Sequence, residues 1–309
     1  MIVYGGEALS RYGFGEDHPF GSDRFQVFWD AYLDRGIDKS TIQAEPVPGN
    51  KADALLFHTL EYVEHVEELS RLGQGMLDAD TPVFPGVYEA ALTVVGTVLD
   101  ATDRIVKGDT RQAFIPIAGL HHARRDGSAG FCVFNDCGIA IEALRARHGI
   151  RRIAYVDIDA HHGDGVFYAF EDDSELIIAD LHEDGRFLYP GTGHASETGK
   201  GIAAGTKLNV PLPPGATDEL FFKVWPSVLD FLERHRPEFI ILQCGADSIA
   251  GDPITHLSLS PDAHRHAAST LKILAVKLCN GKLLALGGGG YNRENLATTW
   301  NAVIQGLAG

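Results

Sequence analysis

Five continuous apolar stretches constrain the fold of this 309-residue chain more than any other feature of its sequence. Each is four to seven residues long and ends in polar residues or glycine. Strands that are apolar without alternation are typical of parallel sheets that helices cover on both faces. The predicted strands are residues 114–119, 153–159, 176–181, 239–245 and 283–286.

Segments with helical periodicity lie before and between these strands. The alternation of strand and helix along nearly the whole chain predicts an α/β fold with an open, doubly wound and mostly parallel sheet. No internal repeat or low-complexity linker divides the sequence, so we expect a single domain over residues 1–309. The predicted helices are residues 25–33, 55–69, 87–106, 137–148, 220–234, 263–278 and 294–307.

Four of the five predicted strands end in a cluster of polar residues or glycines. In open α/β sheets, ligands bind beyond the carboxyl ends of the strands. We therefore expect these clusters, although far apart in the sequence, to meet at one edge of the sheet and form a site. The clusters are His121-His122, residues 157–162, Asp247 and residues 287–291.

Asp159 and His161 lie two positions apart at the end of the second predicted strand. Residues at this spacing on a strand project to the same side, and a carboxylate and an imidazole can both bind a divalent cation. Asp247, which follows another predicted strand, is the expected third ligand. Three protein ligands leave one coordination position for water, which is typical of a catalytic metal site. The alternative is that these residues only cap the helix that follows.

His121 and His122 follow the first predicted strand. Two imidazoles beside a metal-bound water can act as general base and general acid. Each needs a carboxylate to fix its tautomer and tune its pKa, and Asp157 and Asp164 are available because neither is assigned to the metal. The alternative is that the two histidines are ordinary exposed polar residues of a loop.

Four consecutive glycines, residues 287–290, precede Tyr291. They lack the G-x-G-x-x-G order and the lysine of phosphate-binding loops. Glycines let a backbone pass close to a site, which would aim the Tyr291 hydroxyl inward, where a phenol can stabilise an oxyanion. A phosphate-binding loop and a core position for Tyr291 remain the alternatives.

The composition excludes some classes of partner. The 26 Lys+Arg and 42 Asp+Glu residues give a net charge of −16 without any basic stripe, which argues against a nucleic-acid partner. No stretch approaches the 18 apolar residues of a membrane span, and the first residues lack the pattern of a signal peptide. The four cysteines form no C-x-x-C pair. We therefore expect a cytoplasmic protein with reduced thiols and no membrane partner.

Taken together, these residues resemble the zinc-dependent histone deacetylase family, in particular its bacterial branch of deacetylase-like and acetoin-utilisation proteins. The resemblance covers nearly the whole chain, and several motifs in the family's order are far more specific than any one of them. The motifs are Asp17-His18-Pro19 with Arg24, residues 119–123, Gly130-Phe131-Cys132 with Asn135-Asp136, and residues 157–166, 189–193, 245–253 and 287–291.

The resemblance implies the arginase/deacetylase fold, with a central sheet of about eight strands, as one catalytic domain. It also implies that Asp159, His161 and Asp247 bind zinc or ferrous iron. Tyr291 would polarise the carbonyl group of the substrate.

The resemblance also assigns different roles to the two histidines. His122, paired with Asp164, would be the main general base and acid. His121, paired with Asp157, would act mainly through its charge.

A narrow tunnel for the stem of an acyl-lysine and an internal channel beneath the metal are implied in the same way. Arg24 would lie in the channel, through which acetate leaves. The tunnel residues would be Gly130, Phe131, Leu188, Tyr189 and Ile254.

The resemblance further implies a potassium site beside the zinc. It would use the side chain of Asp157, the main-chain oxygens of Asp159, His161 and Leu181, and residue 180. This chain has Asp180 where the family often has serine, so the site carries an additional negative charge.

Binuclear manganese ureohydrolases share this fold, but they need further aspartates four residues after Asp159 and two residues before Asp247. Gly163 and Gly245 stand at those positions, which favours a one-metal amidohydrolase. The expected reaction is hydrolysis of an Nε-acyl-lysine amide in a protein or peptide to the free amine and acetate. An acetylpolyamine amidohydrolase and an inactive acyl-lysine-binding module are the alternatives. The acyl-chain preference, the native metal and the oligomeric state stay open.

Overall fold

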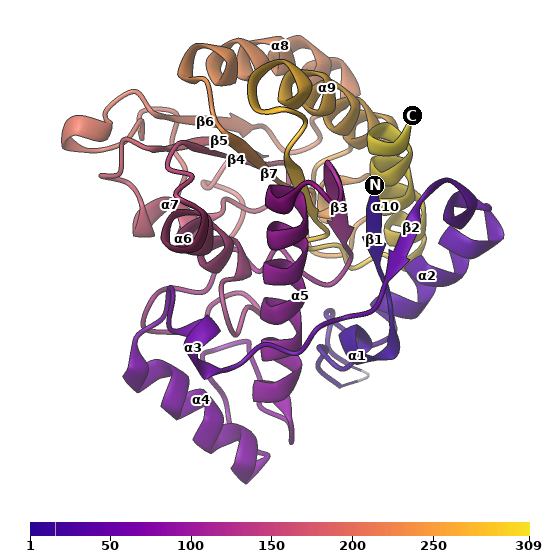
Figure 1. Cartoon of the computed structure of the whole chain (residues 1–309), viewed down its shortest axis with the longest axis vertical. Coiled ribbons are helices and arrows are strands. Elements are labelled where there is room, and N and C mark those ends of the chain that lie inside the picture. The colour runs from indigo at the N-terminus through magenta and orange to yellow at the C-terminus, as the bar shows by residue number, and fades with distance from the viewer. Residues whose placement is uncertain (16) are drawn as a thin grey trace.

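Eight parallel strands form one sheet in the computed structural model, which describes residues 1–15 and 17–309 (Figure 1). The strand order is β2-β1-β3-β8-β7-β4-β5-β6, and every neighbouring pair is parallel. This arrangement confirms the predicted open, doubly wound sheet. The strands are β1 (Ile2–Tyr4), β2 (Ile42–Ala44), β3 (Gln112–Ile115), β4 (Ile153–Asp157), β5 (Leu176–Glu183), β6 (Lys207–Leu212), β7 (Phe239–Gln243) and β8 (Leu283–Leu286).

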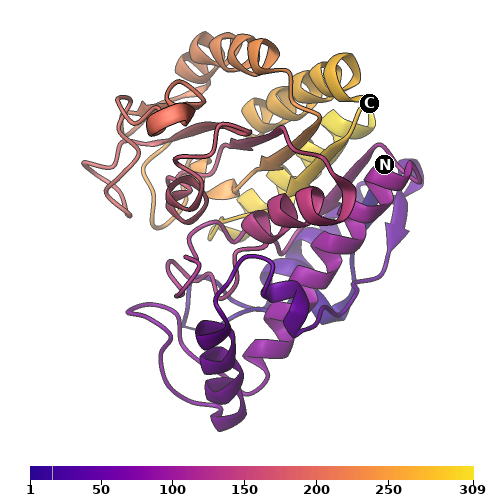
Figure 2. The ribbon, with the colours of Figure 1, turned by 60° about the vertical axis from the view of Figure 1, so that its left-hand side comes forward.

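Helices cover both faces of this sheet, as the alternating pattern predicts (Figures 1 and 2). Helices α2, α8, α9 and α10 pack along one face, α5 and α6 lie along the other, and α1, α3 and α4 lie against α5. The helices are α1 (Glu7–Ser10), α2 (Arg24–Asp34), α3 (Lys51–Ala54), α4 (Leu60–Leu72), α5 (Val87–Lys107), α6 (Asp136–His148), α7 (Asp164–Ala169), α8 (Asp218–His235), α9 (Pro261–Cys279) and α10 (Arg293–Ala308), with short 3₁₀ turns η1 (Ile37–Ser40), η2 (Gly201–Ala203) and η3 (Ala246–Ser248).

The five strands predicted from continuous apolar stretches are all present and fully buried. Three others carry no such signal. β1 has only three residues, and β2 lies at an edge of the sheet with its first two residues exposed. β6, at the opposite edge, alternates in burial and contains Pro211, which a sheet tolerates at an edge strand.

The predicted helices are present with small shifts at their ends, except in the region of residues 55–69. There the chain forms the short helix α3, a turn, and then α4. Helix α4 begins only at Leu60 because Thr59 adopts an extended conformation and its hydroxyl accepts the hydrogen bond from Tyr62 N. In the described part of the chain, no helix combines the length and apolarity needed to cross a lipid bilayer.

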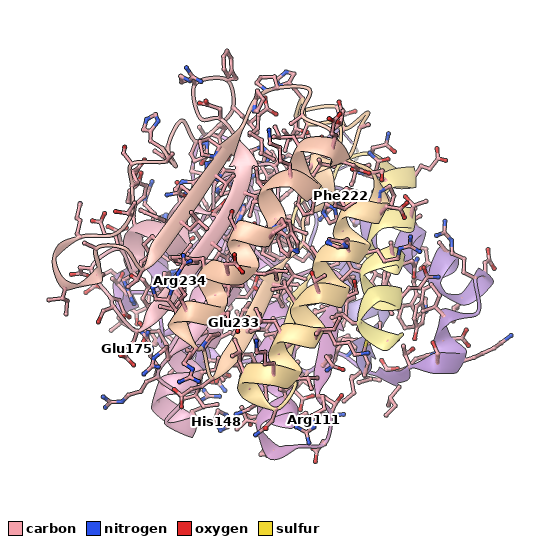
Figure 3. The ribbon with its side chains drawn as sticks, turned by 90° about the horizontal axis from the view of Figure 1, so that it is seen from above. Arg111, His148, Glu175, Phe222, Glu233 and Arg234 are labelled. Atoms are coloured by element: carbon pink, nitrogen blue, oxygen red, sulfur yellow. The ribbon has the colours of Figure 1, made fainter. Side chains whose placement is uncertain are left out.

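The carboxyl ends of β3, β8, β7 and β4 lie side by side at the centre of the sheet. Figure 3 labels three residues at the opposite edge of the sheet, where the strands begin. Arg111 directly precedes β3, Glu175 directly precedes β5, and His148 ends α6 before the loop that leads into β4. The loops that follow the four central strands are therefore brought together at one edge, where a doubly wound sheet binds its ligand.

Candidate active site

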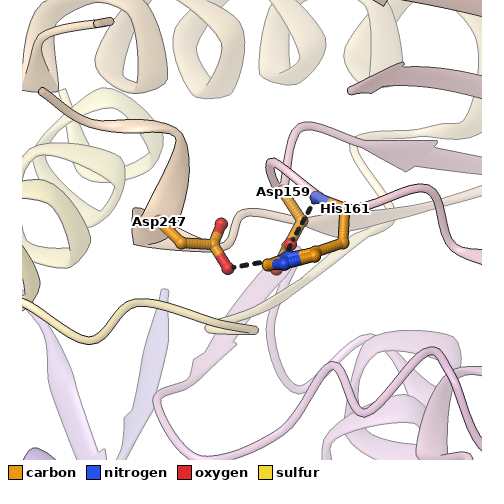
Figure 4. Close-up of side chains that lie close together, drawn as sticks. All are labelled: Asp159, His161 and Asp247. Carbon is orange, nitrogen blue, oxygen red and sulfur yellow. Dashed lines mark hydrogen bonds and ion pairs between the residues drawn. The ribbon is translucent and has the colours of Figure 1, made fainter. Parts of the chain in front are cut away.

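Two carboxylates and one imidazole converge beyond the carboxyl ends of β4 and β7 (Figure 4). Asp159 and His161 follow β4, and Asp247 lies in η3 after β7. His161 Nδ1 is 3.1 Å from Asp159 Oδ1 and 3.2 Å from Asp247 Oδ2. The three side chains are buried, and their ligand atoms lie within 4.8 Å of one another. This donor set fits one divalent transition-metal ion.

The electrostatics of these three residues also favour a cation. Asp247 Oδ2 is buried and, among the described residues, accepts no hydrogen bond of good geometry. Burial and the charge of Asp159 raise the pKa of Asp247. Burial disfavours a charged His161, but the nearby carboxylates of Asp159 and Asp247 outweigh this and raise its pKa to about 10. Uncompensated buried carboxylates are costly, so the site is suited to hold positive charge.

The local structure that joins Asp159 to His161 differs from the one predicted. β4 ends at Asp157, so neither residue projects from a strand. They meet instead in the following loop, where Asp159 Oδ1 accepts a hydrogen bond from His161 N at 3.0 Å. Asp159 Oδ2 accepts hydrogen bonds from Gln243 Nε2 and from Gly289 N, both at 2.9 Å. Gln243 was not singled out from the sequence, although its place at the end of β7 is the signal that could have found it.

Among the described residues, Asp159, His161 and Asp247 form the one group of three side chains that could hold a metal ion. Gly163 and Gly245 occupy the positions where a binuclear site would need aspartates. The backbone also leaves no room there: a Cβ atom on Gly245 would overlap Asp159 Oδ2, and one on Gly163 would lie 2.7 Å from Asp157 Oδ2.

His121 and His122 are both buried and each contacts a different carboxylate. His121 Nδ1 is 2.8 Å from Asp157 Oδ2, and His122 Nδ1 is 2.6 Å from Asp164 Oδ1. Their Nε2 atoms are 3.1 Å apart. If Nδ1 of His122 donates to Asp164, its Nε2 carries the lone pair that a general base requires.

The surroundings of the two histidines shift their pKa values in opposite directions. Burial alone would lower both values. The charges of Asp157 and Asp159 outweigh burial at His121 and raise its pKa to about 10. At His122, burial and the positive charge of His121 together outweigh Asp164 and lower the pKa to about 4. At neutral pH, one imidazole is therefore charged and its neighbour is neutral.

The turn that carries the two histidines is held by the first residues of α6. The carboxylate of Asp136 accepts hydrogen bonds from Gly119 N at 2.8 Å and from Leu120 N at 3.0 Å. The side-chain amide of Asn135 donates to the carbonyl oxygens of His121 and Ala123 at 3.2 Å and 2.8 Å. Asn135-Asp136 belongs to the motifs quoted above, but the sequence alone did not indicate that these residues position the histidine pair.

Tyr291 follows the four glycines of the loop after β8. Its backbone N donates to Asp252 Oδ2 at 2.8 Å, and burial raises the pKa of its phenol. Gly289 N donates to Asp159, and a Cβ atom on Gly289 would overlap Asp247 Oδ2. The glycines thus bring the backbone against the metal ligands, and the N–H of Gly289 is directed to a protein carboxylate. This arrangement supports the close-approach interpretation over the phosphate-binding one.

A narrow cavity, with only about 10 Å³ of space that a water molecule can enter, is bordered by these residues. Gly130 borders it, and a Cβ atom there would lie 2.5 Å from the His122 ring, at a backbone φ of 54°. Cys132 and Tyr291 also contribute to its wall. The remaining lining residues are Phe20, Gly119, Leu120, His121, His122, Asp159, His161, Gly288 and Gly289.

The other predicted tunnel residues are not among those that line this cavity, namely Phe131, Leu188, Tyr189 and Ile254. Phe131 contacts Tyr291 edge to face at 5.8 Å between ring centroids, and Tyr189 contacts His122 in the same way at 5.2 Å. Tyr189 is half exposed, and Ile254 is partly buried. Leu188 is buried in a small hydrophobic cluster with Ala160, Leu212, Ala216 and Leu257 and does not line the cavity.

Arg24 is fully buried behind the glycine loop. Its Nε donates to Gly290 O at 2.9 Å and its Nη2 to Gly288 O at 2.8 Å. Its guanidinium group lies 3.9 Å from the centroid of the Phe20 ring. Nη1 is buried without a hydrogen-bond partner in the described part of the chain, so this atom remains available for an anion.

Asp157 and Asp180 are paired in register across β4 and β5, and both are buried. Asp180 Oδ1 is 2.6 Å from His182 Nδ1, and Asp180 Oδ2 accepts a hydrogen bond from Gly163 N at 2.9 Å. Burial and the charge of Asp180 raise the pKa of Asp157, although the charge of His121 opposes this. These oxygen donors are of the type that hard cations bind.

Comparison with known proteins identifies the family. The chain matches the histone deacetylase domain over residues 18–307. The chain belongs to the histone deacetylase family. It is 35% identical over 292 residues to the acetoin utilization protein AcuC of Bacillus subtilis, covering 91% of this chain and 75% of that protein. A probable deacetylase of Archaeoglobus fulgidus is 34% identical over 297 residues, covering 94% and 82%.

A solved structure supports the same assignment. The HDA15 HD domain superposes with a TM-score of 0.90 at 27% identity and covers 99% of this chain and 87% of that structure. The arginase/deacetylase fold and the resemblance to the acetoin-utilisation branch are thereby confirmed. Membership of the histone deacetylase family supports a deacetylase function, and the buried Asp159, His161 and Asp247 form a group that can hold the metal on which the family generally depends.

Proposed function

We propose that this protein is a zinc- or iron-dependent lysine deacetylase, which hydrolyses an Nε-acetyl-lysine amide of a protein or peptide to the free amine and acetate. The observation that carries this proposal is the pair of adjacent histidines, each in contact with its own carboxylate, beside three residues that could hold a metal ion and a tyrosine that lines the same narrow cavity. The sequence motifs of the chain and its membership of the histone deacetylase family support the same reaction.

Asp159, His161 and Asp247 would hold the metal ion. Such an ion would act as a Lewis acid toward the amide carbonyl and lower the pKa of the attacking water. The side chains of this metal site are fixed by Gln243 and Gly289, which hydrogen-bond Asp159. A site whose ligands are held in this way needs little rearrangement during the reaction.

The neutral His122 would take a proton from water through Nε2 and then give it to the leaving amine. Asp164 holds the other nitrogen of this ring at 2.6 Å, which fixes the tautomer and stabilises the imidazolium that forms. The charged His121 would add a fixed positive charge beside the reacting carbonyl, supported by Asp157. Tyr291 would donate a hydrogen bond to the oxyanion of the tetrahedral intermediate.

The remaining residues of the cavity would bind the substrate and release the product. Phe131 and Tyr189 would flank the apolar stem of the lysine, with Gly130 at the narrowest point and Ile254 near the rim. Arg24 would bind acetate in the internal channel through its unpartnered Nη1. We further propose a potassium ion between Asp157 and Asp180, bound also by main-chain oxygens of Asp159, His161 and Leu181.

Acetate release from an Nε-acetyl-lysine peptide by protein with a measured metal content tests the proposal. We expect turnover with zinc or ferrous iron and none after the metal is removed. Protein that holds one metal per chain, binds the peptide and releases no acetate would contradict the proposal and indicate an acyl-lysine-binding module.

Acetylputrescine is the comparison substrate, because the net charge of −16 would also suit a polycation. A higher kcat/KM for acetylputrescine than for the acetyl-lysine peptide would make the protein an acetylpolyamine amidohydrolase. Peptides with longer acyl groups on lysine would define the acyl-chain preference.

A further inference from the structure

Arg293, the first residue of α10, joins two loops beside the cavity, although the proposed reaction does not use it. Its Nε and Nη2 donate to the two carboxylate oxygens of Asp23, both at 2.7 Å. Its Nη1 donates to Pro19 O at 3.2 Å and to Tyr291 O at 3.1 Å. Arg293 itself is not among the residues that line the cavity. These four hydrogen bonds are called the Arg293 bridge below.

Both members of the ion pair depart from the usual preferences at the start of a helix. Asp23 directly precedes α2, where an aspartate usually accepts a hydrogen bond from the first turn, but its side chain makes no such bond. Arg293 places a positive charge at the N-terminus of α10, where the helix dipole disfavours it. Such local exceptions are expected at functional sites. The ion pair accounts for both of them.

The local structure favours a charged and bidentate pair. The hydrogen bonds from Arg293 lower the pKa of Asp23, so its carboxylate is ionised at neutral pH. Gly21 leaves the space that the pair occupies, because a Cβ atom there would lie 2.5 Å from Asp23 Oδ1 and 2.8 Å from Arg293 Nη2. Two parallel N–H···O bonds fix the plane of the guanidinium group, which directs Nη1 toward the two carbonyl oxygens.

The two loops that the Arg293 bridge joins both contribute to the cavity wall. Phe20, which follows Pro19, lines the cavity, and so does Tyr291. Because a single Nη1 binds the carbonyl oxygens of Pro19 and Tyr291, it limits how far these loops can separate. Arg24, the first residue of α2, bonds to the glycine loop before Tyr291 as well. Helices α2 and α10 pack against each other, so each supplies an arginine that ties the two loops together.

The exposure of the pair separates its effect on position from its effect on stability. The side chains of Arg293 and Asp23 are 32% and 57% exposed. Ion pairs with this much contact to water contribute little to the free energy of unfolding. A variant without the Arg293 bridge should therefore still fold, and Tyr291 N should keep its hydrogen bond to Asp252 as its remaining attachment.

We propose that Arg293, oriented by Asp23, is a positioning residue that sets where Tyr291 places its hydroxyl group. This inference rests on the proposed function, in which that hydroxyl donates to the oxyanion. An oxyanion donor must lie about 2.7–3.1 Å from the oxygen it stabilises. A misplacement of about 1 Å caused by a change outside the reacting groups can cost about 10²-fold in rate.

Arg293→Gln and Asp23→Asn test the proposal, because each removes the bidentate pair from one side. We expect kcat on an acetyl-lysine peptide to fall by about 10- to 100-fold in both variants. KM should stay near the wild-type value, because the contact that is lost acts in the transition state. The metal content should not change, and the Tm should stay within about 2 °C. Arg293→Lys should be intermediate, since lysine keeps the charge without the fork.

Combining Arg293→Gln with Tyr291→Phe distinguishes positioning from a general structural role. If Arg293 acts through the Tyr291 hydroxyl, the double variant should be no more than about 2-fold slower than Tyr291→Phe alone, because residues that act as a unit are not additive. A structural role would give the same fall in both backgrounds. Arg265→Gln is the control, since Arg265 forms an exposed pair with Asp262 on α9, and its turnover should match the wild type.

Hydrogen exchange of the Tyr291 amide tests the inference without the reaction. We expect this amide to exchange faster in Arg293→Gln and Asp23→Asn than in the wild type and in Arg265→Gln. If the wild type releases no acetate, faster exchange would still support the positioning of Tyr291, while the proposed function would fail.

Three results would overturn the inference. The first is unchanged exchange, the second is an unchanged kcat in both single variants of an active enzyme, and the third is an additive effect in the double variant. Failure of both Arg293→Gln and Asp23→Asn to fold would also contradict it, because the Arg293 bridge would then serve the fold and not Tyr291.

Discussion

Two adjacent histidines in this protein have different protonation states because their neighbours differ. His121 lies between two carboxylates, Asp157 and Asp159, and holds a positive charge despite burial. His122 contacts a single carboxylate, Asp164, and lies next to the charge of His121. The same residue type therefore supplies both a fixed charge and a proton acceptor. This division depends on side chains from three segments of the chain and cannot be read from the dipeptide itself.

At the same scale, Tyr291 is expected to act on the oxyanion and not on the metal. Tyr291→Phe removes one hydroxyl and leaves the aromatic ring in place. Removal of one oxyanion donor costs about 10²–10³ in rate, so we expect kcat on an acetyl-lysine peptide to fall by about that factor. Metal content measured by mass spectrometry should be unchanged.

Tyr32→Phe provides the control for this substitution. Tyr32 is buried in α2, where its hydroxyl bonds to Thr41 Oγ1, and it is not among the residues that line the cavity. Its turnover should match the wild type. Near-normal turnover of Tyr291→Phe would remove Tyr291 from the mechanism.

At the scale of elements, the sequence predicted the buried strands and most helices, and it was least informative where strands end. β3, β4 and β7 all stop before the predicted end, and β3 is followed directly by Pro116, which has no N–H to donate to a neighbouring strand. Asp159 and His161 were correctly paired in space, but by a loop and not by strand alternation. β1 could not be predicted because three residues are too few to give a signal, and β2 and β6 because these edge strands are not continuously apolar.

The sequence alone also did not predict which residues support the site through hydrogen bonds. Gln243 and Asp136 bond to groups far from them in the sequence, and only the fold shows which groups these are. Leu188 was placed at the tunnel only because the family resemblance implied it. The two residues Leu188 and Tyr189 lie in a turn, where Leu188 is buried in a separate hydrophobic cluster while Tyr189 contacts His122.

The loop after β7 has no space for a side chain at Gly245. A Cβ atom there would overlap Asp159 Oδ2, so Gly245→Ala must displace a proposed metal ligand. We expect metal affinity to fall by at least the factor of about 10–100 that changes around metal ligands usually cause, as measured by competition with a chelator. Gly15→Ala is the control, because a Cβ atom at Gly15 meets no atom within 4 Å. Unchanged metal affinity in Gly245→Ala would mean that Asp159 is not a ligand.

The N-terminus of α6 should give the protein a pH-dependent stability. Burial outweighs the hydrogen bonds from Leu120 and Gly119 and raises the pKa of Asp136 to about 6 from 3.8. The folded protein therefore keeps a proton that the unfolded chain has already lost between these two values. The stability that Asp136 contributes is complete below pH 3.8 and is lost as the pH rises through 6.

Asp136→Asn tests this pH dependence because asparagine does not titrate. The free energy of unfolding of the variant relative to the wild type should rise by about 2–3 kcal/mol between pH 4 and pH 7. Urea unfolding at a series of pH values measures this difference. A difference that does not change with pH would show that the folded-state pKa of Asp136 is not raised.

At the scale of the whole molecule, the net charge of −16 is a poor guide to function. Asp157, Asp159, Asp180 and Asp247 are all buried within one region, where imidazoles and proposed cations offset their charges. They therefore contribute little to the field outside the protein. With the proposed ions bound, this concentration of buried carboxylates would make the stability of the entire chain depend on them.

Metal removal should consequently lower the stability of the whole protein. A substitution of Asp247 should change the Tm in opposite directions with and without the metal. We expect chelation to reduce the Tm by roughly 5–10 °C, since an ion at about a thousand times its Kd stabilises the folded state by about 4 kcal/mol.

Without metal, the buried Asp247 is repelled by Asp159, so Asp247→Asn should raise the Tm of the metal-free protein. With metal, the same variant has lost a ligand and should be less stable than the wild type. Asp126→Asn, at an exposed position, should change neither value. An Asp247→Asn variant that loses stability in both states would show that Asp247 has a structural role independent of the metal.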